Sequence, residues 1–461
     1  MKSLFTAVVG LSLAVRSASG AVEVVSDHSD AMYRCGETAV LAVRLTDGAG
    51  HAMSTGRVSV VVDDFGSHRQ LERDFDLASA NPFAVSGSLS APGFLRLTLR
   101  GAGVKGTFTW SAGYEPDRIR PVTERPADLD EFWAEARARL AREVPLDARM
   151  DRVAERSAAA FDFYRISFAT FGRRVYGYMS VPTDSSRKPY PVSVGIAAGG
   201  FGDWTNDLAG RPDRICVFFS VYPFEPDWRW REKGLRRKFE EMNRDLAARF
   251  GTSYAAAGAG VSREAYFYYP VILGIDRALD WIAARPDVDR RDFAYQGASQ
   301  GGGLGLVLTG LNRRITRASF YLPSLTDMLA GRAGLQCGCT RLVEEQQTAE
   351  AKETAKRTLP YFDGAAFAAR ITCPVRFAVG LSDTTCTPHC TWGAFNAVAS
   401  KDKMLLYGIG LGHDFRNGFY DALGAWTCGS EVQFRRRLDE LRALEREGFV
   451  RIRPFAPAQD E

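Results

Sequence analysis

One serine of the chain is flanked by glycines two positions away on both sides, in Gly297-Ala298-Ser299-Gln300-Gly301. Such a turn holds the serine in a strained backbone conformation, and side chains in place of the glycines would collide with the packed strand and helix. A buried strand is predicted before it, and a helix of small residues after it. The first backbone N–H groups of that helix would face a developing oxyanion. The pattern predicts a catalytic nucleophile, and an ordinary turn is the alternative.

A nucleophilic serine needs a base, and in α/β-hydrolases the chain order is serine, then an acid, then histidine. Two histidines follow Ser299 in the chain, His389 and His413. His413 lies in a glycine-rich loop directly after the last predicted strand, 404–407, which is where the base belongs. His389 follows the preceding strand, whose loop usually supplies the acid. We therefore expect His413 to be the base.

The acid should follow the strand predicted at 375–379, and Asp383 does so. The alternative for Asp383 is a solvated turn aspartate. Asp414 is too close to His413 in sequence to be its expected partner. Ser299, Asp383 and His413 would then all lie at the carboxyl ends of strands, where open α/β sheets place their sites.

Two backbone N–H groups are expected to stabilise the oxyanion, those of Gln300 and Gly200. Gly200 belongs to a glycine loop, 199–204, that follows a buried strand at 191–198. A phosphate-binding loop is the alternative, but no Gly-Lys-Ser/Thr follows these glycines. Three nearby aromatic residues could form a sugar-stacking rim, with core or lid packing as the other interpretation: Phe201, Trp204 and Tyr222.

The chain of 461 residues is long enough for two domains. Short β-rich segments from residue 21 to residue 114 predict a small immunoglobulin-like β-sandwich. Residues 115–127 contain prolines and form the expected linker. Strands and helices then alternate over residues 128–461, which predicts an α/β-hydrolase fold with a mostly parallel sheet covered by helices. An amphipathic helix with an Asp128 cap and Glu131 three residues later opens this domain.

The first 20 residues resemble a secretory signal peptide, because Lys2 precedes an apolar run and small residues end the segment. An uncleaved anchor is the alternative, but Arg16 interrupts the run and no later stretch is long enough to span a bilayer. We expect export to the periplasm or the extracellular space. Eight cysteines in an exported protein predict some disulfides, although Cys386-Thr387-Pro388-His389-Cys390 also has metal-ligand residue types. The net charge of +4 indicates no nucleic-acid partner.

The motifs resemble those of the acetyl xylan esterase and cephalosporin C deacetylase family of carbohydrate esterases. The elbow 297–302 and the acid loop 380–388, with its cysteine and proline, are similar to that family's motifs, and the resemblance spans about 125–419. The stretch 220–224 differs, because family members usually have Arg-Gly-Gln-Gly there, and the N-terminal domain lies outside the simple family pattern. The resemblance implies a serine esterase that removes acetyl groups from sugars and uses no metal or other cofactor. It leaves a homo-oligomeric assembly open. A feruloyl esterase, a peptidase and a non-catalytic glycan-binding protein remain as alternatives.

Overall fold

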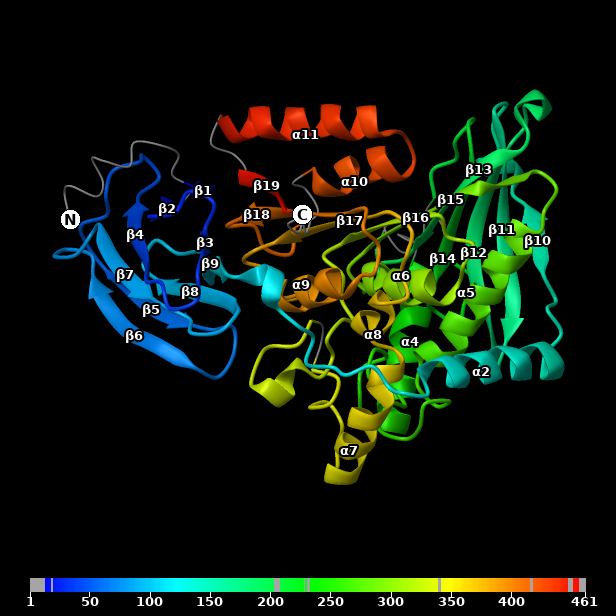
Figure 1. The fold of residues 1–461 in the computed structure, drawn as a ribbon, viewed down its shortest axis with the longest axis horizontal. Helices are drawn as coiled ribbons and strands as arrows, with labels where there is room; N and C mark the ends of the chain where they lie inside the picture. The colour runs from blue at the N-terminus through cyan, green and yellow to red at the C-terminus, as the bar shows by residue number, and fades with distance from the viewer. Residues whose placement is uncertain are drawn as a thin grey trace.

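The structure is a computed structural model that describes residues 13–17, 20–202, 208–227, 229, 233–338, 341–414, 418–446 and 451–455. Among these residues it contains two small β-sheets at the N-terminal end and one ten-stranded sheet. Figure 1 shows the two small sheets together at one end of the molecule, in blue, beside the large sheet and its helices. The predicted all-β region followed by an α/β-hydrolase-like domain is confirmed, and the large sheet proves to be mixed.

The N-terminal region is a sandwich of two sheets, and its strands alternate buried with more exposed side chains, as in Phe83–Gly87. This alternation places valine, leucine and tryptophan between the sheets and leaves polar residues outside. Leu13–Ser17 lies within the segment predicted as a signal peptide and pairs with Gly20–Ser26; residues 1–12, 18 and 19 lie outside the described part of the chain. One sheet has the order β1(Leu13–Ser17), β2(Gly20–Ser26), β4(Ala39–Thr46), β7(Phe83–Gly87), and the other has β3(Met32–Tyr33), β9(Phe108–Tyr114), β8(Gly93–Gly101), β5(Arg57–Asp63), β6(Arg69–Asp76).

The segment predicted as a linker lies against the large domain and forms specific hydrogen bonds with it. The side-chain amide of Asn396 donates to the carbonyls of Pro116 and Ile119, at 2.8 and 3.0 Å. Farther along, the N–H of Thr123 donates to the buried carboxylate of Asp327 at 2.7 Å. These bonds fix the path of the chain between the two domains.

The large sheet is parallel at its centre and antiparallel at both edges. At its centre, five neighbouring strands run parallel: β13(Tyr190–Ile196), β15(Val288–Ala298), β16(Arg317–Tyr321), β17(Val375–Gly380) and β18(Lys403–Ile409). The other neighbour of β13, β14(Ile215–Ser220), is also parallel to it. The edge strands β10 and β19, both antiparallel to their neighbours, were not predicted. In spatial order the strands are β10(Arg149–Arg152), β11(Phe161–Thr170), β12(Arg173–Pro182), β14(Ile215–Ser220), β13(Tyr190–Ile196), β15(Val288–Ala298), β16(Arg317–Tyr321), β17(Val375–Gly380), β18(Lys403–Ile409), β19(Arg451–Phe455).

Helices cover both faces of this sheet. Figure 1 shows α10 and α11 above it, and α2, α4, α5, α6, α8 and α9 on the opposite side. Asp128 precedes α2 as predicted, but its carboxylate accepts the hydroxyl of Tyr361 and does not cap the helix. The helices are α2(Leu129–Glu143), α4(Lys233–Phe250), α5(Tyr268–Ala283), α6(Gln300–Leu311), α7(Ala349–Thr358), α8(Gly364–Ala368), α9(Pro388–Ala397), α10(Phe419–Thr427) and α11(Glu431–Arg446).

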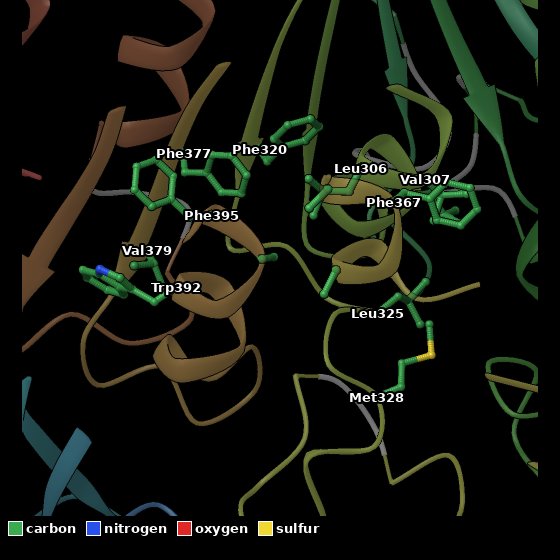
Figure 2. Packing of buried hydrophobic residues seen from close by; sticks show 14 of the residues in the cluster. Leu306, Val307, Phe320, Leu325, Met328, Phe367, Phe377, Val379, Trp392 and Phe395 are labelled. Carbon is green, nitrogen blue, oxygen red and sulfur yellow. The ribbon is translucent and has the colours of Figure 1, made fainter. Parts of the chain in front are cut away.

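The core beneath the sheet holds α6 rigidly. Every residue of α6 is buried, which is why this helix is apolar all round and has no polar face. Figure 2 shows Leu306 and Val307 of α6 in the same buried cluster as Phe367, Phe320 and Phe377. The Gly-x-Ser-x-Gly turn at the start of α6 is therefore supported by a closely packed core. No helix within the described ranges is long and apolar enough to cross a bilayer.

Candidate active site

Ser299 lies between the end of β15 and the start of α6, in the turn predicted for a nucleophile. Its backbone has φ 51° and ψ −119°, a conformation that side chains rarely adopt. Three backbone hydrogen bonds hold it there. Its N–H donates to the carbonyl of Tyr321 at 2.9 Å, and its carbonyl accepts the N–H groups of Ser324 and Gly303, at 2.9 and 3.1 Å. Strain of this kind persists where the surroundings over-determine it, as they do at functional sites.

The two glycines of the turn are required by close packing. A Cβ at Gly297 would lie 2.4 Å from the carbonyl oxygen of Gly301. A Cβ at Gly301 would lie 2.3 Å from the carbonyl oxygen of Ile196 at the end of β13. Side chains at either position would therefore push the helix away from the strand and open the turn.

The side chain of Gln300 anchors the start of α6 to the glycine loop. Its carbonyl oxygen accepts the hydroxyls of Tyr254 and Tyr268, each at 2.8 Å. Its amide donates to the carbonyl of Ala197 at 3.0 Å. The backbone N–H of Gln300 has no acceptor within α6, because it belongs to the first turn of the helix.

His413 and Asp383 meet at the same edge of the sheet, as their positions after β18 and β17 predict. His413 Nδ1 lies 2.8 Å from Asp383 Oδ2. The other oxygen, Oδ1, accepts the N–H groups of Thr385 and Cys386, each at 2.8 Å. Asp383 is fully buried while His413 is partly exposed. The imidazole ring and the two N–H groups thus fix the orientation of the carboxylate.

Cys386 lies directly beside the serine, a neighbour that the sequence did not reveal. Its Sγ is 4.0 Å from Ser299 Oγ. A carboxylate oxygen of Asp383, the sulfur of Cys386 and a ring nitrogen of His413 all lie within 4.8 Å of one another. The serine, the thiol, the imidazole and the carboxylate therefore form one compact cluster, and Ser299 and His413 both face the same cavity.

The alternative base, His389, is not grouped with Asp383, Cys386 and His413. Its ring is fully buried at the start of α9, and burial lowers its pKa to about 4. Neither ring nitrogen has a hydrogen-bond partner. Among the described residues, the group of possible metal-ligating atoms around Cys386 includes neither His389 nor Cys390. Cys390 Sγ lies 3.2 Å from the hydroxyl oxygen of Thr387. His389 is a neutral packing residue.

The prediction of disulfides is wrong for the described part of the chain. The seven cysteines there are all free thiols, and Cys339 lies outside the described residues. Cys386 and Cys390 are both fully buried, but Cys386 faces Ser299 while Cys390 packs with Cys337. Backbone hydrogen bonds, and not a covalent crosslink, therefore shape the loop that carries Asp383.

The glycine loop lies next to the serine, with Gly200 at φ +87°. The Tyr222 hydroxyl donates to the Gly200 carbonyl at 2.5 Å. Tyr222 is fully buried, and burial raises its pKa well above the ordinary value. The prediction that Tyr222 lines a sugar-binding rim is therefore wrong, because the ring supports the loop from inside. It occupies the stretch 220–224 that departs from the family motif.

Phe201, the next residue of the loop, packs against Phe239 of α4 with ring centroids 5.4 Å apart. The guanidinium of Arg236 lies over the same ring. Phe201 therefore helps to fasten α4, and contact with substrate remains a prediction for it. Trp204 lies outside the described residues.

A cavity of about 770 Å³ opens beside Ser299 and His413. Residues of β13, β14 and β15 line it, including small ones such as Ser193, Gly195 and Ala298. Leu208 and Tyr420 also belong to its lining. The lining is mainly apolar, and Ser299, His413 and the thiols of Cys216 and Cys428 belong to it. Pockets of this kind hold a small organic group against a few polar atoms.

Comparisons with known proteins agree with this geometry. The model of the acetyl xylan esterase (AXE1) family matches residues 115–429. The chain is 27% identical over 395 residues to the acetyl esterase Axe7A of Xylanibacter ruminicola, covering 83% of this chain and 84% of that protein.

Solved structures share the fold. The acetyl xylan esterase from Paenibacillus sp. R4 superposes with a TM-score of 0.54 at 22% identity, covering 71% of this chain and 98% of that one. Acetyl xylan esterase 1 from Thermoanaerobacterium sp. JW/SL YS485 gives a TM-score of 0.54 at 20% identity, with coverage of 67% and 95%. Nearly the whole of each enzyme therefore aligns with part of this chain.

Proposed function

Because the chain belongs to the acetyl xylan esterase (AXE1) family of carboxylic ester hydrolases, we propose that it removes acetyl groups from acetylated carbohydrates through Ser299, His413 and Asp383. The observation that carries this proposal is the contact of Asp383 with His413, 2.8 Å long, in the same cluster as a strained serine. A nucleophile, a base and an orienting acid in this arrangement are what acyl transfer requires.

In the proposed mechanism, His413 accepts the proton of Ser299 as the serine oxygen attacks the acetyl carbonyl. Asp383 holds Nδ1 and stabilises the imidazolium that forms. The N–H groups of Gln300 and Gly200 are proposed to stabilise the tetrahedral oxyanion. The sugar hydroxyl then leaves with the proton from His413, and an acetyl ester remains on Ser299. Water, deprotonated by His413, attacks this ester and releases acetate, and the proton returns to Ser299.

Asp383→Asn should lower kcat by roughly 10⁴-fold, the loss known from the same change in a serine protease triad. The shape of the side chain is kept, but its amide cannot hold the correct tautomer or stabilise the imidazolium. Hydrolysis of p-nitrophenyl acetate, normalised by titration with a serine-reactive phosphonate, measures the loss. Asp414→Asn is the control, with near-normal kcat expected. If Asp414→Asn loses activity while Asp383→Asn keeps it, the acid is misassigned.

The substrate is tested by acetate release from acetylated xylan and acetylated xylo-oligosaccharides, and by hydrolysis of a peptide ester. The proposal expects the acetylated glycans to have the highest kcat/KM, and preferential cleavage of the peptide ester contradicts it. A second candidate, a feruloyl-type esterase, is favoured by one observation: the cavity of about 770 Å³ is far larger than an acetyl group needs. A matched series of acetyl and feruloyl esters of one sugar separates the two candidates by their kcat/KM ratio.

We also propose export, supported by the charged and apolar pattern of residues 1–20. Cleavage near Ala21 would remove β1 and leave the other strands of the sandwich and the hydrolase domain in the mature protein. The mass of the protein recovered from outside the cytoplasm tests this, since an intact N-terminus on exported protein would contradict cleavage.

A further inference from the structure

The sandwich contacts the catalytic domain through the loop between β5 and β6. The N–H of Ser67 donates to the carbonyl of Gly334, and the N–H of Gln336 donates to the carbonyl of Phe65, both at 3.0 Å. Gly66 fits into this contact because it lacks a side chain: a Cβ there would lie 2.2 Å from the Gly334 carbonyl oxygen. The loop of one domain is therefore matched to the backbone of the other.

Phe65 is the centre of this contact. It is fully buried and has φ +63°, a left-handed conformation that is uncommon for a bulky residue. Its N–H donates to Asp63 Oδ1 at 3.0 Å, which holds the turn. Its ring lies edge-on to that of His389 in the catalytic domain, with centroids 6.5 Å apart. A strained aromatic residue whose ring reaches the next domain indicates a position under functional constraint.

Arg96 joins this loop to Gln336. Its guanidinium forms a two-point ion pair with Asp63, both distances 2.8 Å, and stacks over the ring of Phe65 at 4.8 Å. Its remaining donor reaches Gln336 Oε1 at 3.2 Å. The buried carboxylate of Asp63 thus fixes the arginine, and the arginine fixes the side-chain amide of Gln336.

Gln336 in turn holds both ends of the turn that follows Asp383. Its side-chain amide donates to the carbonyl of Thr384, and its backbone carbonyl accepts the hydroxyl of Thr387 at 3.2 Å. Between these two points lie the N–H groups of Thr385 and Cys386, both donated to Asp383 Oδ1. A continuous series of contacts therefore leads from the sandwich to the proposed catalytic acid.

We propose that the N-terminal sandwich is part of the catalytic apparatus, with Phe65, Arg96 and Gln336 as positioning residues that hold the Asp383 loop against His413. This inference rests on the proposed function, because it acts through Asp383. Among the described residues the cysteines are free thiols, so no disulfide holds the Asp383 loop. The contacts through Phe65, Arg96 and Gln336 hold it in place instead. The sandwich is then more than a spacer or a separate binding module.

Phe65→Ala in the full chain tests the proposal. We expect kcat per titrated active site to fall by an amount on the order of 10²-fold, with KM little changed, because a small misplacement of a catalytic group has effects of that size. Gln336→Met should do the same from the catalytic-domain side, without touching the core of the sandwich. Phe83→Ala is the matched control: Phe83 is buried in the sandwich against Phe75. It should lower the melting temperature and leave kcat per site unchanged.

A double-mutant cycle with Asp383→Asn separates the two proposals. If Phe65 acts through Asp383, Phe65→Ala adds little further loss in the Asp383→Asn enzyme. Full additivity, or equal kcat values for Phe65→Ala, Gln336→Met and Phe83→Ala, overturns the positioning role while the triad stands. If Asp383→Asn alone keeps its kcat, the proposed function fails instead. Should Phe65→Ala not fold, the Gln336→Met arm of the cycle decides by the same criteria.

Discussion

Ser299→Ala is expected to remove ester hydrolysis almost completely, with kcat reduced on the order of 10⁶-fold, as when the nucleophile of a serine protease is deleted. The change removes one oxygen at a corner whose backbone is held by Tyr321 and Ser324, so the melting temperature should hardly move. Hydrolysis of p-nitrophenyl acetate measures kcat, and thermal denaturation measures the melting temperature. Labelling by a serine-reactive phosphonate should disappear together with activity.

Cys386→Ala is the matched variant, because this thiol lies 4.0 Å from the serine oxygen and is the other nucleophilic side chain in the cluster. In Cys386→Ala the phosphonate should still attach to Ser299, as peptide mapping would show. A Ser299→Ala enzyme that keeps its turnover, with loss of turnover in Cys386→Ala, would assign the nucleophile to the thiol.

His413→Ala should be as damaging as the loss of the serine, because the members of a triad act as a unit. Without the imidazole, Ser299 has no base and the leaving sugar oxygen has no proton donor. Attack by the serine and departure of the sugar both become slow, so kcat should fall. Single-turnover measurements of the acylation rate would show this loss. The double variant Ser299→Ala/His413→Ala should be no slower than either single variant.

His389→Ala provides the control within the same chain. This ring is fully buried and touches Phe65, so its removal leaves a cavity and should lower the melting temperature. Its loss of kcat per titrated site should be far smaller than that of His413→Ala. The reverse order of the two losses would make His389 the base.

The sequence predicted the local structure around the candidate site well where short-range patterns determine it. The strand, the glycine turn and the helix around Ser299 follow from hydrophobic pattern and backbone geometry, and the loops after β17 and β18 bring Asp383 to His413. The antiparallel strands β10 and β19 were missed because they are only four and five residues long. Short edge strands bear little periodicity from which to recognise them.

Residues that act through packing could not be assigned in the same way. Tyr222 follows a buried strand, and an aromatic side chain there can turn inward to the loop or outward to solvent with the same local sequence. Phe65 and Gln336 belong to different domains, so no pattern within either segment indicates their contact. The disulfide prediction came from the inferred compartment, whereas Cys386 and Cys390 prove to face different neighbours.

The order of the parts along the chain has a consequence for biosynthesis. Domains tend to fold as units while the chain emerges, the N-terminal one first. The sandwich, with Phe65 in place, is therefore available before any of the proposed triad residues has been translated. The loop with His413 comes much later, and its strand β18 gains its outer neighbour only when residues 451–455 have been made. A nascent chain should therefore have no esterase activity during most of its translation. The sandwich is made first, and the loop that we propose it aligns is made later.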